Sequence, residues 1–222
     1  MPIFLKEHSY GEYIFDHAWA DAFQQHGLNY YPKMISAIPF TPLTGSRVLA
    51  KDSEVKKAMI KAIEKILVEY KISSCHILFP NKKDHELFNE MGWLSRKGVQ
   101  FKWQNNSYEK FSEFLETLSH NKRKKIKQER KKIETNGISI ERKQGENISS
   151  EDIDFFYECY CETYRLHNST PYLKKYFFYE LVKTMPNKLL VIIAKKNGMK
   201  IASAFNIIGE DTLYGRYWGA LE

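Results

Sequence analysis

His8 and Glu12 are the side chains whose types and spacing best fit acid–base chemistry. Residues 8–15 predict an extended strand, in which every second side chain points to the same side. His8, Tyr10 and Glu12 would then share one face, with His8 and Glu12 as candidate catalytic groups and Tyr10 against the substrate. Such a pair could deprotonate an attacking amine. The alternative is an ordinary hydrogen-bonded pair on a partly exposed strand.

A second candidate binding face lies near the other end of the sequence. Residues 212–221 are aromatic and predict a strand. Alternation along that strand would place Tyr214, Arg216 and Trp218 on one face, where they could stack on a substrate or hold a carboxylate. The alternative is packing of an aromatic strand into the core.

The loop of residues 41–47 has the composition of an anion site. It offers threonine and serine hydroxyls, a flexible Gly45 and the guanidinium of Arg47. It matches neither a Walker motif nor a dinucleotide fingerprint, so a plain connecting loop is the alternative.

The positive charge of the chain is concentrated in one segment. Residues 122–132 carry eight bases and one acid, a balance of +7 that equals the net charge of the whole protein. This run predicts a tRNA platform, a nonspecific RNA or DNA contact, an anionic membrane surface, or simply a solvated helix face. Membrane insertion is disfavoured, because only Ile126 and Ile133 are apolar here. The candidate contact residues are Lys122, Arg123, Lys124, Lys125, Lys127, Arg130 and Lys131.

The composition is that of a globular protein, with 43% hydrophobic and 14% aromatic residues among 222. No run approaches the roughly 20 apolar residues of a membrane span, and the start lacks the features of a signal peptide. Cytoplasmic localisation is expected. The three cysteines form neither a disulfide framework nor a Cys-x-x-Cys motif. No third ligand is suitably spaced from His8 and Glu12, so no metal site is predicted.

Strand and helix patterns alternate along the chain and predict an α/β or α+β layer fold. The first part combines helices and strands, expected at residues 18–25, 30–40, 53–70, 75–79, 84–91 and 99–103. The second part predicts one long helix, a strand, two helices and a three-stranded meander, expected at residues 108–134, 138–142, 149–164, 172–185, 189–194, 199–208 and 212–221. Lys196-Asn197-Gly198 predicts a type I′ hairpin turn within that meander.

A short echo links the two ends of the sequence. Tyr10-Gly11-Glu12-Tyr13 is matched by Tyr214-Gly215-Arg216-Tyr217. If it marks an internal repeat, the chain holds the back half of one copy and the front half of the next, and both ends look interrupted.

Four stretches also carry a resemblance to a known family: residues 8–19, 31–47, 122–132 and 211–219. With them the chain resembles FemAB-like proteins of peptidoglycan biosynthesis or recognition, which are acyltransferases of the GNAT type. The resemblance implies incomplete tandem GNAT-like units, truncated at both ends. Residues 1–104 would be the C-terminal part of the first unit, and residues 105–222 the basic helix and the N-terminal part of the second.

The same resemblance implies transfer of an amino acid or acyl group to an amine of a cell-wall precursor or peptide. The donor would be an acyl-CoA or an aminoacyl-tRNA, with no other cofactor expected. The donor's pyrophosphate site of the second unit would lie beyond Glu222, so the chain alone is expected to be weakly active or inactive. A partner chain could complete the sheets. The alternative function is a nucleic-acid (tRNA)-binding module that uses the basic helix of residues 108–134.

Overall fold

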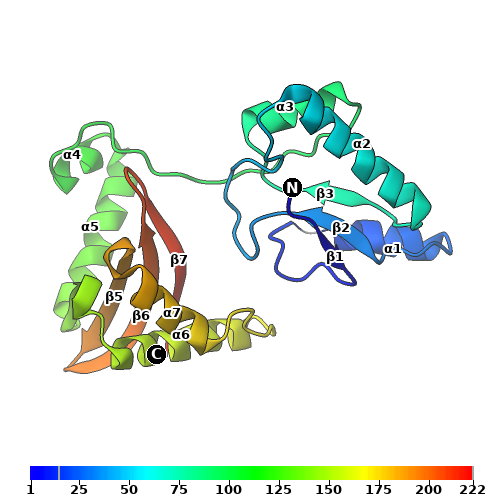
Figure 1. The fold of residues 1–222 in the computed structure, drawn as a ribbon. Helices are drawn as coiled ribbons and strands as arrows, with labels where there is room; N and C mark the ends of the chain where they lie inside the picture. The colour runs from blue at the N-terminus through cyan, green and yellow to red at the C-terminus, as the bar shows by residue number, and fades with distance from the viewer. Residues whose placement is uncertain (15, 222) are drawn as a thin grey trace. The chain divides into compact units, whose positions relative to one another are not determined.

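The computed structural model describes residues 1–14 and 16–221, which form two compact units, Met1–Lys102 and Trp103–Glu222 (Figure 1). Each unit combines a β-sheet with helices, and the described residues contain seven α-helices in all. The fold is therefore mixed α+β. The assignment of residues 1–104 and 105–222 to halves of acyltransferase domains stays a prediction.

Unit 1 is built on a three-stranded sheet in the order β1-β2-β3. The central strand β2 (Lys33–Ser36) runs antiparallel to β1 (Phe4–Lys6) and parallel to β3 (Cys75–Ile77). The strand predicted at residues 30–40 is thus observed only over Lys33–Ser36. The helices of this unit are α1 (His17–Gln25), α2 (Ser53–Glu69) and α3 (Lys82–Glu90).

Helix α2 connects the two parallel strands and supplies much of the core of unit 1. Its N-terminus is capped by the Asp52 carboxylate, which accepts hydrogen bonds from two backbone amides of the first turn. This helix, predicted at residues 53–70, buries Ile60 and Ile63. Ile60 packs with Val48, Leu87 and Phe88, so α2 and α3 share one small core.

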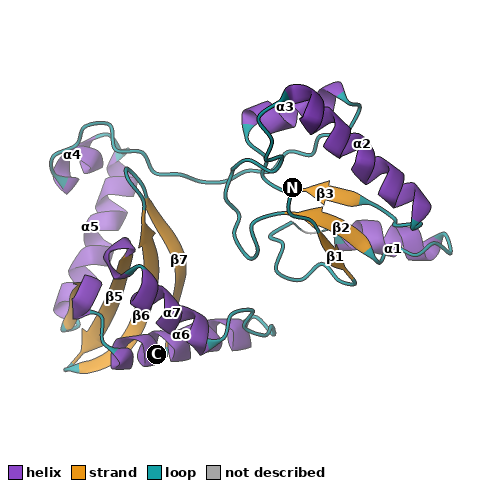
Figure 2. Cartoon of the chain, in the orientation of Figure 1, coloured by secondary structure: helices purple, strands orange, loops and turns teal. Residues whose placement is uncertain are grey.

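Unit 2 contains a four-stranded antiparallel sheet in the order β4-β5-β6-β7. In chain order its elements are α4 (Phe111–Glu116), α5 (His120–Thr135), β4 (Ile138–Gln144), the 3-10 turn η1 (Gly145–Asn147), α6 (Ser150–Leu166), α7 (Lys175–Thr184), the 3-10 turn η2 (Pro186–Lys188), β5 (Leu189–Lys196), β6 (Met199–Ile208) and β7 (Leu213–Ala220). Helix α6 packs against β6 and β7, with α7 beside it (Figure 2). The hairpin between β5 and β6 confirms the predicted turn, since Asn197 and Gly198 both have positive φ.

The core of unit 2 is aromatic. Phe156 and Tyr160 of α6, Phe178 of α7 and Phe205 of β6 are buried, and their rings meet at centroid distances of 5.0–6.1 Å. Such offset and edge-to-face contacts add to the stabilisation from buried apolar area. This core holds a layer of two helices, α6 and α7, against the sheet.

Two predicted strands are wrong. Residues 7–14 form turns and bends, with Gly11 and Tyr13 at positive φ, and Phe15 lies outside the described residues. Positive φ is incompatible with a continuous strand. Residues 99–103 are also irregular, and Val99 and Phe101 are 85% and 95% exposed. Their alternating pattern favours a strand, but a strand also needs hydrogen-bonded neighbours, which local pattern does not reveal.

The single helix predicted at residues 108–134 is two helices. Residues 117–119 separate α4 from α5, and the Thr117 hydroxyl donates a hydrogen bond to the Phe114 carbonyl at 2.8 Å. A threonine that bonds its own backbone competes with helix continuation. The break lets α4 fold back beside α5, where the Arg130 guanidinium lies 4.6 Å from the centre of the Phe111 ring.

The echo between the two ends has no common local structure. Tyr10 to Tyr13 lie in a turn, whereas Tyr214 to Tyr217 lie in β7. The hypothesis of a repeat at these residues is therefore not supported by their conformations.

Candidate functional site

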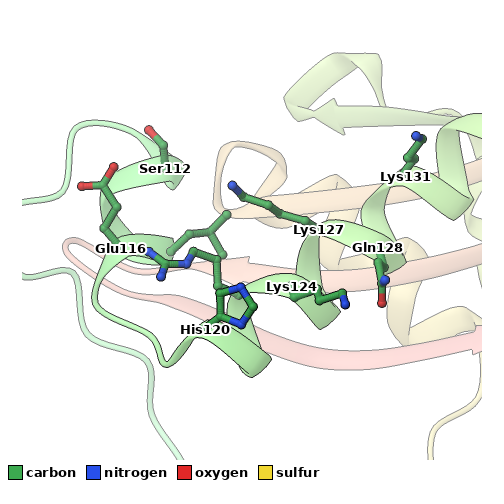
Figure 3. Close-up of a pocket in the computed structure, with 9 residues that line it drawn as sticks. Ser112, Glu116, His120, Lys124, Lys127, Gln128 and Lys131 are labelled. Carbon is green, nitrogen blue, oxygen red and sulfur yellow. The ribbon is translucent and has the colours of Figure 1, made fainter.

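A groove between α4 and α5 gathers four of the cationic residues of α5. It encloses about 540 Å³ and is lined by Ser112, Leu115, Glu116, His120, Arg123, Lys124, Lys127, Gln128 and Lys131. Ser112 and Glu116 come from the short helix, and the polar side chains of α5 line the other side (Figure 3). Four of the nine residues are Lys or Arg and one is acidic, so the groove favours an anionic ligand.

Helix α5 is exposed along its whole length, which explains how it can hold so many like charges. None of its residues is buried. With 16 residues it is about 24 Å long. Charged side chains on an exposed helix keep their hydration, so the helix forms without the cost of burying ions. The result is a long cationic surface that several phosphate groups could contact.

The predicted cationic residues divide into two groups by helical periodicity. Arg123, Lys127 and Lys131 are spaced four apart, and with Lys124 they line the groove. The other three, Lys122, Lys125 and Arg130, are not among the lining residues. Arg130 stacks on Phe111, and Lys125 lies 3.9 Å from the Glu129 carboxylate.

Four further polar residues line the groove and are not among the residues predicted from the sequence: Ser112, Glu116, His120 and Gln128. His120, Lys124, Lys127 and Lys131 follow a spacing of four, three and four, which was a usable signal on the α5 side. Ser112 and Glu116 could not be found without knowing where the helix breaks and folds back.

Glu12 belongs to a buried ionic network in unit 1. Its Oε2 lies 2.8 Å from the Nζ atom of Lys33, which also lies 2.5 Å from Asp16 Oδ2 and donates a hydrogen bond to Ser9 Oγ at 2.7 Å. The Lys33 side chain is completely buried, and the two carboxylates are 3% and 1% exposed. A buried ammonium needs such compensation, because an unpaired charge in the interior is strongly unfavourable.

The network continues from Asp16 toward β3. The Tyr30 hydroxyl donates to Asp16 Oδ2 at 2.7 Å and lies 3.1 Å from His76 Nε2. Burial alone would raise the pKa of Asp16, but hydrogen bonds from Lys33, Ser9 and Tyr30 outweigh it and lower the pKa to about 2. Burial and the nearby Lys33 charge lower the pKa of His76, which favours the neutral imidazole.

The structure places His8 and Tyr10 differently from Glu12. Both are exposed, and the Tyr10 amide donates to His8 Nδ1 at 3.2 Å. Their shared face with Glu12 was expected from a strand that does not form. Their catalytic and substrate-binding roles stay predictions.

Arg47 is directed into the protein. It is 3% exposed, and its guanidinium donates to the carbonyls of Leu78 at 2.8 Å and Leu43 at 2.6 Å. Its backbone amide donates to Asp84 Oδ2 at 2.6 Å. These contacts tie the loop of residues 41–47 to α3 and to the residue that follows β3. Anion binding by Arg47 stays a prediction.

The predicted common face of Tyr214, Arg216 and Trp218 is wrong, because a bulge interrupts the pairing of β7 with β6. Tyr214 pairs with Ile207 and Trp218 with Ala204, and the register shifts between these pairs. Paired residues share a sheet face, and positions 204 and 207 of a regular strand face opposite sides. Tyr214 and Trp218 therefore point to opposite faces. Arg216 lies over the Tyr217 ring, 4.5 Å from its centre.

None of the helices in the described part of the chain is long and apolar enough to cross a membrane. A comparison with curated proteins finds no match. A family model described as peptidoglycan biosynthesis/recognition, the FemAB-like family, matches residues 1–222. Because the match covers the whole chain, the protein belongs to the FemAB-like family.

Proposed function

We propose that this protein takes part in the transfer of an aminoacyl or acyl group from an anionic donor to an amine of a cell-wall precursor or peptide. The observation that carries the proposal is the cationic groove between α4 and α5. Both donor classes, acyl-CoA and aminoacyl-tRNA, bear phosphates that lysine and arginine recognise. Membership of a peptidoglycan-related family supports the acceptor class. In this interpretation the two α+β units are GNAT-like units arranged in tandem.

The dimensions of α5 favour aminoacyl-tRNA over acyl-CoA. Its exposed length of about 24 Å exceeds what one pyrophosphate requires. Successive phosphates of a nucleic acid could instead meet Arg123, Lys127 and Lys131, which repeat along one side of the helix. The groove would then position the donor, and other residues would perform the transfer.

A transfer assay tests the proposal. The protein is incubated with radiolabelled aminoacyl-tRNA or acetyl-CoA and an amine-bearing muropeptide precursor, and label in the acceptor is measured. We expect weak label from aminoacyl-tRNA, as predicted for this chain alone, reduced at least tenfold when Lys124, Lys127 and Lys131 are changed to Gln. The matched control changes the exposed Lys61, Lys65 and Lys83 of unit 1 to Gln. No transfer from either donor, or equal loss in both variants, contradicts it.

The alternative function is a tRNA-binding module without transferase activity, favoured by the exposure of the whole of α5. The same assay separates the two. Binding of deacylated tRNA that depends on Lys124, Lys127 and Lys131, with no label transferred, would support the binding module.

A further inference from the structure

Unit 1 contains a cavity that the proposed function does not use. It encloses about 330 Å³ beside β1 and β2 and is lined by Phe4, Leu5, Lys6, Gly11, Glu12, Ile35, Ala37, Ile38, Pro39, Phe40, Thr41 and Phe79. All of these except Lys6, Glu12 and Thr41 are apolar or aromatic. An apolar cavity with a few convergent polar groups is the usual form of a small-molecule site.

The carboxylate of Glu12 presents to this cavity an oxygen that only a partly exposed lysine holds. Its side chain is 3% exposed, and Oε2 is held by Lys33 at 2.8 Å. The other oxygen, Oε1, is ion-paired with the ammonium of Lys6 at 2.9 Å. The same ammonium donates a hydrogen bond to the Tyr10 carbonyl at 2.8 Å. A ligand ammonium that replaced Lys6 would keep the buried carboxylate compensated.

The backbone around the cavity is strained. Phe40 and Phe79 line it with φ angles of 51° and 50°, a region that bulky side chains rarely adopt. Such strain concentrates at ligand-binding sites. Gly11 has φ 79°, and a Cβ atom there would lie 2.5 Å from the Phe40 ring. The two loops that wall the cavity are thus in close contact.

We propose that this cavity binds a small organic cation, a primary ammonium on an aromatic or aliphatic body, whose ammonium donates to Glu12 Oε1. Phe4, Ile35 and Phe79 would contact the apolar body. At roughly 30 Å³ for a water-sized group, the volume accommodates about ten non-hydrogen atoms. The buried Glu12 charge disfavours a carboxylate ligand. A cavity of this size holds a free small amine and not the cell-wall precursor or peptide of the proposed function, so this inference goes beyond that function.

Lys6 acts as the internal competitor of the ligand in this proposal. Its ammonium lies 2.9 Å from Glu12 Oε1, the position that the ligand ammonium would take. Because the Lys6 side chain is 19% exposed, it can turn toward solvent when a ligand enters. Lys33 remains paired with Glu12 and Asp16, so the buried network stays intact in both states.

Three probes with the same body test the charge preference: phenethylammonium, 2-phenylethanol and 3-phenylpropionate. Binding to the full chain is followed by NMR shifts of the Ile35 and Ile38 methyl groups. We expect phenethylammonium to bind at least tenfold more tightly than the alcohol, and the carboxylate to bind most weakly. No shifts with any probe, equal binding of amine and alcohol, or tightest binding of the carboxylate would overturn the proposal.

Two variants test the residues. Lys6→Met removes the competing ammonium and is expected to tighten phenethylammonium binding at least threefold, a gain that loss of folding cannot produce. Lys83→Met, on the exposed side of α3, should leave binding unchanged. Glu12→Gln should reduce amine binding to the level of the alcohol. Weaker amine binding by a folded Lys6→Met protein would overturn the assignment of Lys6 and Glu12.

Discussion

Lys33 Nζ lies 2.5 Å from Asp16 Oδ2, and both side chains are buried, at 0% and 1% exposure. With Glu12 at 2.8 Å on its other side, the ammonium joins β2 to the loop of residues 7–14 and to the residue before α1. The ion network therefore links these segments in addition to the backbone pairing of β1 with β2.

Replacing Lys33 with Met should strongly destabilise unit 1. The substitution leaves Glu12 and Asp16 as buried carboxylates without their cation, and breaking a buried pair costs about 3–5 kcal/mol. The free energy of unfolding is measured by urea titration with hydrogen exchange of β2 amides as the local probe. Lys61→Met on the exposed face of α2 should change it by less than about 0.5 kcal/mol. A Lys33→Met loss below about 1 kcal/mol contradicts the account.

The stability of unit 1 should fall in acid as Asp16 is protonated. Its pKa is lowered from 3.8 to about 2, so its contribution is complete above pH 3.8 and is lost as pH falls through about 2. The loss is about 2 kcal/mol, since one pKa unit corresponds to about 1.4 kcal/mol. Protection of β2 amides is measured between pH 5 and 2. In the Asp16→Asn variant, the fall in amide protection between pH 5 and 2 should become smaller. The same pH dependence of protection in the variant and the wild-type protein would count against the network.

Elements whose local signals agree were predictable from sequence. The helix at residues 53–70 and the Asn197-Gly198 turn are confirmed because propensity, pattern and turn chemistry point the same way. The strands predicted at residues 8–15 and 99–103 are wrong, because a strand needs hydrogen-bonded neighbours that are distant in the sequence. No local signal marks Lys33 as a functional candidate, since its sequence neighbourhood does not show that carboxylates 21 and 17 residues away meet its ammonium.

The site was predictable in composition but not in shape. The charge run identified α5 as a cationic surface, whereas the groove depends on the break at residues 117–119. The bulge in β7 shows the same limit, because alternation predicted a common face for Tyr214 and Trp218. One extra residue in a strand reverses the face of every residue beyond it.

Gly219→Ala should destabilise unit 2, because an added Cβ would lie 2.1 Å from the Cys159 carbonyl oxygen of α6. Backbone atoms cannot move aside as a flexible side chain can, so we expect a loss of roughly 2–3 kcal/mol. Gly215→Ala is the matched control in the same strand, where the nearest atom would be 3.7 Å away. Thermal unfolding followed by near-ultraviolet circular dichroism measures both. Equal melting temperatures for the two variants would contradict the close approach of β7 and α6.

Arg47→Lys tests whether Arg47 is structural or binds an anion. The guanidinium donates to the carbonyls of Leu78 and Leu43, and a lysine cannot reproduce that fork. We expect a loss of about 1–3 kcal/mol in unfolding free energy with unchanged affinity for tRNA. Reduced tRNA affinity in a protein of normal stability would instead support the predicted anion site at the loop of residues 41–47.

The salt dependence of tRNA binding tests the central claim, that α5 holds a phosphate-bearing donor, most directly. Each lysine that contacts a phosphate contributes about 0.7–0.9 to the slope of log K against log salt. The account predicts that changing Lys124, Lys127 and Lys131 to Gln lowers this slope by about two to three, while changing Lys61, Lys65 and Lys83 to Gln leaves it unchanged. Equal slopes for the wild-type protein and both variants would contradict it.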